Sequence, residues 1–297
     1  MFYGYNVSCN QLHTSSSSYW SAFIERFSPR LYYIIHKRKG ERAFLSHLLS
    51  LVVEVESPAR NRMKAVLYIC HGSRSKEGQK EAIAFVERLS SSISIPIQHI
   101  CFLELCEPDI VTGVERCVRD GATTILAIPL LLLAANHAKH DIPYELEKAK
   151  KMFPHVTITY GKPFGVQHDI ISALSAMIEH ADAIMLVGRG SSDTEAQADF
   201  QQIAYLLQNE TNIPVYPCYL AAASPSFSDV VTSLSKTANH KRVAVVPYIL
   251  FFGQLLDYIH KTLQAQQASD VSFTLYPPVR TYDVLDHLVK QQVKEWG

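Results

Sequence analysis

The chain has 297 residues, of which 47% are hydrophobic and 19% charged, and its 28 basic and 28 acidic side chains give a formal net charge of zero. This balance excludes a disordered polyelectrolyte and a protein with a global basic surface for nucleic acid. No run of about 18 apolar residues occurs, so no membrane-spanning helix is expected. The six cysteines show no CxxC spacing, which indicates reduced thiols in a cytoplasmic protein rather than a disulfide framework.

Residues 1–62 differ in composition from the rest of the chain. Eight Lys and Arg side chains against four acidic ones give this segment a charge of +4 and leave −4 on the remainder. A serine run, Ser15–Ser18, and a basic cluster, His36–Lys39, lie here, and a buried-strand pattern begins only after Met63. Three interpretations are open: Met63 is the natural start, residues 1–62 are a poorly ordered extension, or they are a transit peptide.

From Met63 onward the sequence repeats itself at a nearly constant offset. The apolar run Ala65–Ile69 leads to His71, and the run Ala183–Val187 leads to Arg189, which lies 118 residues later. Three further landmarks match in the same way: 102–104 with 219–221, 124–133 with 243–251, and 160–163 with 276–278. The repeat predicts two similar lobes of one chain, at 63–180 and 181–297.

Each lobe alternates short apolar runs with amphipathic stretches. In the first lobe we predict strands at 65–70, 97–102, 124–128 and 156–160, and helices at 77–92, 108–119, 143–152 and 168–179. Strands separated by helices imply parallel sheets covered on both faces. The predicted fold is therefore α/β, with two similar doubly wound lobes. Because ligands of such folds bind beyond the carboxyl ends of the strands, we expect the site in the cleft between the lobes.

Three side chains at these strand ends are candidates for chemistry. His71 follows the first apolar strand, Glu104 ends the second, and His137 follows the apolar run 130–133. Alone, His71 could cap a turn and Glu104 could be a paired carboxylate, since an unpaired buried carboxylate is costly. Together, two imidazoles and a carboxylate suit a divalent cation such as Fe, Co, Ni or Zn. The corresponding positions of the second lobe hold Arg189, Ala221 and Leu255.

These motifs resemble those of the class II chelatases of tetrapyrrole synthesis. The resemblance rests on His71-Gly72-Ser73-Arg74, on Phe102-Leu103-Glu104 and above all on residues 129–143, PLLLLAANHAKHDIP. It covers about residues 63–297, and within the family it is strongest to the bacillar sirohydrochlorin ferrochelatases, relatives of the anaerobic cobaltochelatases. The resemblance implies a two-lobed fold, in agreement with the repeat. It also implies that His71 and His137 bind the metal and that Glu104 is their acidic partner in catalysis.

The resemblance further implies a lyase that inserts Fe²⁺ into sirohydrochlorin to give siroheme, with the metal as substrate and no organic cofactor. Since residues 63–297 are net negative, local side chains must bind the substrate carboxylates, and the candidates are Ser73, Arg74, Lys139 and Arg189. Some cobaltochelatases of the family carry His-rich segments, so the resemblance implies that the lack of one here favours iron. The alternatives are a Co²⁺-inserting cobaltochelatase of cobalamin synthesis, a non-catalytic carrier of metal or tetrapyrrole, and a two-lobed small-molecule binding protein. We expect a cytoplasmic monomer that binds neither nucleic acid nor membrane.

Overall fold

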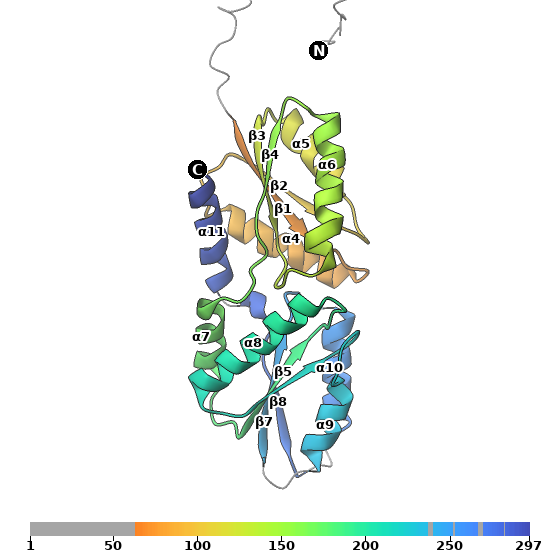
Figure 1. Cartoon of the computed structure of the whole chain (residues 1–297), viewed down its shortest axis with the longest axis vertical. Coiled ribbons are helices and arrows are strands. Elements are labelled where there is room, and N and C mark those ends of the chain that lie inside the picture. Colours follow the sequence, from red (N-terminus) through yellow and green to blue (C-terminus); the bar gives the residue numbers. More distant parts are fainter. Residues whose placement is uncertain (1–62, 237–239, 252, 267–269, 282) are drawn as a thin grey trace, which may run out of the picture. The chain divides into compact units, whose positions relative to one another are not determined.

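The structure is a computed structural model, and it describes residues 63–297 except 237–239, 252, 267–269 and 282 (Figure 1). The three interpretations of residues 1–62 lie outside the described residues. All described residues belong to one structural unit, residues 62–297. Within it, no described helix combines the length and the hydropathy that a membrane crossing requires.

Two four-stranded parallel sheets form the framework of the two lobes (Figure 1). Their strand orders are β2-β1-β3-β4 and β6-β5-β7-β8, so β1 and β5 occupy equivalent central positions. The strands of the first sheet are β1 (Lys64–Cys70), β2 (Ile97–Phe102), β3 (Thr124–Pro129) and β4 (Thr157–Tyr160). Those of the second are β5 (Ala183–Gly188), β6 (Val215–Tyr219), β7 (Arg242–Tyr248) and β8 (Ser272–Leu275). The predicted α/β fold with two similar doubly wound lobes is confirmed.

Helices connect the strands and cover both sheets. Those of the first half are α4 (Lys76–Ser90), α5 (Ile110–Arg119), α6 (Ile142–Met152) and α7 (His168–Met177). Those of the second are α8 (Thr194–Thr211), α9 (Phe227–Ser235), α10 (Gln254–Gln264) and α11 (Val284–Trp296). Helix α5 begins two residues after the predicted position 108 because the carboxylate of Asp109 caps it, accepting from the Thr112 backbone N–H at 2.7 Å.

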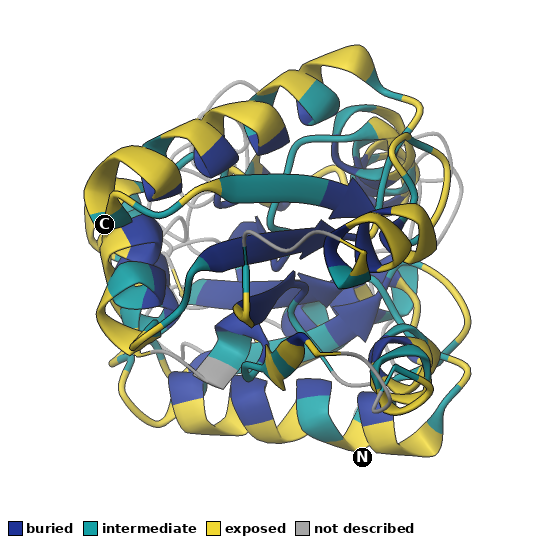
Figure 2. Cartoon of the chain, turned by 90° about the horizontal axis from the view of Figure 1, so that it is seen from below, coloured by how far each residue is buried: buried dark blue, intermediate teal, exposed yellow. Residues whose placement is uncertain are grey.

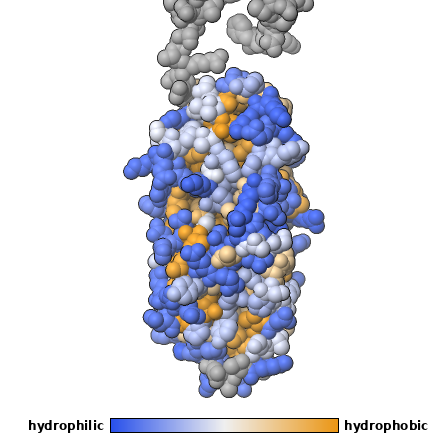
Figure 3. All heavy atoms as spheres, viewed as in Figure 1, coloured by the Kyte–Doolittle hydropathy of each residue, from blue (hydrophilic) through white to orange (hydrophobic). Residues whose placement is uncertain are grey.

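The central strands are buried on both faces, which explains their continuous apolar sequences. In β1 alternate residues face two different cores, so that Val66 and Tyr68 belong to one cluster and Ala65 and Leu67 to the other. Figure 2 shows the buried strands enclosed by helices whose outer faces are exposed. On the face seen in Figure 3, hydrophilic side chains are interspersed with small hydrophobic groups. The five cysteines among the described residues are free.

The last helix of each half packs on the other half. Helix α7 contacts α8, and α11 contacts α7 and β3. Beyond Trp296, the Gly297 carbonyl oxygen accepts from Lys64 Nζ at 3.1 Å, which ties the chain end to the start of β1. The division predicted at residues 180 and 181 follows the sequence repeat, whereas the packing of these two helices crosses it. This exchange, in which α7 and α11 each pack on the other lobe, joins the two lobes through a shared apolar core that contains residues of both sheets.

Candidate metal centre

The turn that follows β1 presents His71. Gly72 adopts a φ of +96°, in the left-handed region that favours glycine, and a Cβ at this position would lie 1.8 Å from the Glu104 carbonyl oxygen. The turn therefore lies directly against the backbone beyond β2. The Glu104 N–H donates to the His71 carbonyl at 3.2 Å, so the two candidate side chains leave adjacent points of one backbone pairing.

The second lobe repeats this backbone arrangement with different side chains. The Ala221 N–H donates to the Arg189 carbonyl at 2.8 Å. A Cβ on Gly190, whose φ is +91°, would lie 1.6 Å from the Ala221 carbonyl oxygen. Arg189 thus occupies the position that corresponds to His71. The fold supplies two equivalent turns, which differ in the side chain that they present, His71 in the first lobe and Arg189 in the second.

His137 opens a π-helical turn, His137–Asp141, that continues directly into α6. The Leu130 N–H donates to the Ile69 carbonyl at 2.8 Å, which brings the segment beyond β3 alongside β1. One turn further along the chain, Asp141 Oδ2 lies 2.7 Å from His137 Nδ1. Because a carboxylate only accepts, Nδ1 carries the proton, and the Nε2 lone pair of a neutral His137 is left for a metal.

The three predicted side chains converge. One ligand atom from each of His71, Glu104 and His137 lies within 4.8 Å of the others. The two imidazole rings are 4.8 Å apart between centroids and nearly perpendicular, and His71 Nε2 lies 3.6 Å from Glu104 Oε1. The side chains of His71, Glu104 and His137 are 26%, 44% and 32% exposed, so solvent reaches all three. The chemistry of this set suits a borderline divalent cation.

The partners of His71 define its protonation. Nδ1 lies 3.3 Å from the Gly72 carbonyl oxygen, which only accepts, and Nε2 lies 3.0 Å from Arg189 Nη1, which only donates. This pattern assigns the neutral Nδ1–H tautomer to His71. The pKa of His71 is lowered below 6.5, first by burial and then by its neighbours Arg189 and His137, while Glu104 opposes the shift. A neutral imidazole at neutral pH is the form that binds metals.

The four predicted substrate-binding residues have different environments. Arg74 is exposed next to the His71 turn, and Arg189 reaches His71 from the opposite lobe. Ser73 supports the turn itself, since its Oγ accepts from the Ser75 N–H at 3.1 Å. Lys139 Nζ instead donates to both carboxylate oxygens of Asp193 and to one of Glu195, in the second lobe.

Sequence reasoning missed three acidic residues around the site. Asp193 accepts twice from Lys139 Nζ, at 2.7 and 2.9 Å, and Glu195 accepts once at 2.9 Å. This contact joins the π-helical turn to the start of α8 and thus joins the lobes. Asp141 is the third, and its spacing of four residues from His137 was a detectable signal. The contacts of Lys139 had no such signal, because they depend on how the lobes meet.

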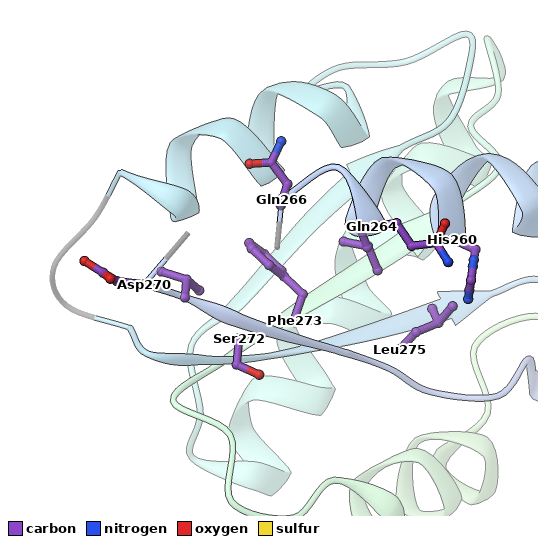
Figure 4. A pocket seen from close by; sticks show the side chains of 9 residues that line it. His260, Gln264, Gln266, Asp270, Ser272, Phe273 and Leu275 are labelled. Atoms are coloured by element: carbon purple, nitrogen blue, oxygen red, sulfur yellow. The ribbon is translucent and has the colours of Figure 1, made fainter. Parts of the chain in front are cut away.

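A separate hollow of about 440 Å³ lies between the end of α10 and β8 (Figure 4). His260 and Asp270 are among its lining residues, with Phe273 and Leu275 along the strand. None of the three clustered side chains, His71, Glu104 and His137, lines it. The hollow begins at the amino-terminal side of β8, whereas the cluster lies beyond the carboxyl ends of β1 and β3.

Comparison with known proteins identifies close relatives. The family model of CbiX matches residues 65–181 and again residues 183–296, once in each half. The sirohydrochlorin ferrochelatase of Priestia megaterium is 44% identical over 240 residues, which cover 78% of this chain and 90% of that protein. The sirohydrochlorin cobaltochelatase of the same organism is 29% identical over 246 residues, covering 78% and 80%. A solved structure, SirB from Bacillus subtilis with Fe³⁺, superposes with a TM-score of 0.70 at 39% identity, covering 78% and 94%.

Proposed function

Because this chain belongs to the CbiX family, we propose that it is a metal chelatase, a lyase that inserts Fe²⁺ into sirohydrochlorin to give siroheme. The resemblance to chelatases read from the sequence motifs is confirmed by the family match and by the ferrochelatase relative. The observation that carries the proposal is the convergence of His71, Glu104 and His137 within 4.8 Å at the junction of two lobes. This set can hold a divalent metal while leaving it accessible.

His71 and His137 hold the incoming metal through their Nε2 atoms. His71 is neutral by its hydrogen bonds, and the Asp141 carboxylate orients the His137 ring from behind. Glu104 supplies a negative charge 3.6 Å from His71 Nε2 and can complete the ligand set. The donors are nitrogen and oxygen atoms, a set that suits Fe²⁺ and Co²⁺. A metal held in this way can be passed on to a macrocycle.

Insertion releases two protons from the macrocycle, because sirohydrochlorin and Fe²⁺ give siroheme and two H⁺. The ring nitrogens must lose these protons as the metal enters. Glu104 is the carboxylate within reach of the metal position, and its 44% exposure gives it contact with solvent. It accepts protons and releases them to water as a general base. The substrate's carboxylates are bound by Arg74 and Arg189, whereas Lys139 holds the lobes together through Asp193.

The direct test is an anaerobic insertion assay. The full chain is mixed with sirohydrochlorin and Fe²⁺, and the absorption change of the macrocycle is followed over many turnovers. His71→Ala and His137→Ala should abolish turnover, and Glu104→Gln should slow it by about a hundredfold or more. His155→Ala is the matched control, since His155 is exposed before β4 at the opposite edge of the sheet. Wild-type rates in both ligand variants would refute the site.

The same assay separates the alternatives. Co²⁺ insertion at a higher specificity than Fe²⁺ insertion would identify a cobaltochelatase, for which the cobaltochelatase relative provides support. Intrinsic affinity favours Co²⁺ over Fe²⁺ at one set of N and O ligands, so rates must be compared at matched free metal concentrations. A carrier would bind metal or macrocycle stoichiometrically without turnover. We also propose a monomer, because both lobes that meet at the cluster belong to one chain.

A further inference from the structure

Arg189 and the metal compete for the same atom of His71. The guanidinium Nη1 donates to His71 Nε2 at 3.0 Å. The other ring nitrogen is directed to the Gly72 carbonyl oxygen at 3.3 Å, so Nε2 holds the single available lone pair. One lone pair cannot accept a hydrogen bond from Arg189 and bind a metal at the same time. Metal binding at His71 therefore requires the guanidinium to leave.

Charge adds to this competition. Arg189 is cationic at every physiological pH, and a guanidinium within hydrogen-bond distance of a metal ligand repels a divalent cation at that ligand. The cluster supplies Glu104 as the opposing charge. Lys139 does not add a comparable repulsion, because Asp193 and Glu195 neutralise it. Arg189 is thus the cation that directly disfavours metal at His71.

The side chain of Arg189 is free to change partner. Its backbone is fixed, since its carbonyl accepts from the Ala221 N–H at 2.8 Å, while the residue itself is exposed. Rotation of the side chain therefore disturbs no packed core. A planar guanidinium pairs most strongly with carboxylates, in bidentate geometry, and such a pair is stronger than its bond to a neutral imidazole. A polycarboxylate macrocycle would offer that better partner at the junction of the lobes.

We propose that Arg189 is a gate on the metal site, which weakens metal binding at His71 until a substrate carboxylate takes up its guanidinium. The inference rests on the proposed function, since it takes His71 as a metal ligand. Substrate binding in the second lobe then raises the metal affinity of the first lobe, because the carboxylate that binds Arg189 also removes it from His71 Nε2. The metal is held firmly only when its acceptor is present, and the two halves of the repeat have complementary roles.

The test measures Co²⁺ affinity of the full chain through the visible absorption of the bound ion, without sirohydrochlorin. Arg189→Met should tighten binding by about tenfold, the low end of what a hydrogen bond to a charged group contributes. Arg189→Gln is a second variant that should also tighten it. Arg119→Met removes the same charge from an exposed side chain at the end of α5 and should change nothing. His71→Ala should weaken binding, and the double variant Arg189→Met/His71→Ala should bind like His71→Ala.

The insertion assay gives a second readout that a merely structural role would not produce. Arg189→Met should lower the KM for Co²⁺ and raise the KM for sirohydrochlorin, because the variant loses both the competitor and the carboxylate partner. If Co²⁺ binding is unchanged or weaker in the Arg189 variants while His71→Ala still weakens it, the gate is overturned and the proposed function stands. The gate would also be overturned if Arg189→Met/His71→Ala bound Co²⁺ more tightly than His71→Ala, or if the KM of Arg189→Met for sirohydrochlorin were unchanged. Wild-type affinity in His71→Ala would overturn the metal site as well.

Discussion

The close approach of the Gly72 turn to the backbone of Glu104 can be tested with one methyl group. Gly72→Ala places a Cβ 1.8 Å from the Glu104 carbonyl oxygen, whereas real Cβ atoms essentially never approach closer than 3.0 Å. The turn and the β2 extension must therefore separate by about 1 Å or more. Gly165 is a matched control, because it has a φ of +69° but no atom within 4 Å of its Cβ position.

The expected cost has two parts. An alanine held in the left-handed region costs about 1–2 kcal/mol. The forced displacement of packed backbone adds about 1–3 kcal/mol, as in other overpacked sites. Gly72→Ala should therefore cost about 2–5 kcal/mol, and Gly165→Ala only the first part, about 1–2 kcal/mol. For a protein of this size the middle of these ranges corresponds to a fall in Tm of about 10 °C for Gly72→Ala and about 4 °C for Gly165→Ala.

Thermal unfolding followed by circular dichroism and the insertion assay together check this prediction. Because the displacement separates Glu104 from His71, Gly72→Ala should also lose at least tenfold in turnover at a temperature where it is fully folded. Gly165→Ala should retain wild-type turnover. Equal Tm values and equal turnover in the two variants would refute the reasoning that the turn fixes the ligand geometry.

Three further predictions concern charge and packing. The imidazole resonance of His71 should titrate in NMR below 6.5, and Arg189→Met should move this pKa upward because the guanidinium disfavours the imidazolium; an unmoved midpoint would contradict the assigned contact. The stabilising effect of this neutral imidazole is present above pH 6.5 and is lost as the pH falls below it, because the unfolded chain then binds more protons. Lys139→Met should lower Tm at low ionic strength more than at high ionic strength, since salt screens the ion pairs between the lobes; a loss independent of salt would argue against their electrostatic role. Leu285→Ala, in the fully buried face of α11, should cost about 2–5 kcal/mol in chemical unfolding, whereas Tyr205→Ala at an exposed position should cost about 0.5 kcal/mol or less, and similar losses would contradict the packing of the exchanged helix.

Much of the fold, and the convergence of His71, Glu104 and His137, could be predicted from the sequence, because both depend on local patterns. Buried parallel strands are short apolar runs, and the 118-residue offset between His71 and Arg189 repeats one backbone unit. Strand ends of neighbouring parallel strands share one edge of the sheet, so His71, Glu104 and His137 could be expected to meet. The position of each ligand after its strand is thus a consequence of chain order.

The tertiary structure decided what happens between the two halves. The exchange of α7 and α11 has no sequence signal, since an amphipathic helix shows that it has an apolar face but not which sheet covers it. The contacts of Lys139 also had no sequence signal. The sequence made it a candidate to bind substrate, and in the structure its ammonium donates to carboxylates of the second lobe. Sequence places each side chain at a strand end, and only the packing of two lobes determines that Arg189 meets the lone pair of His71.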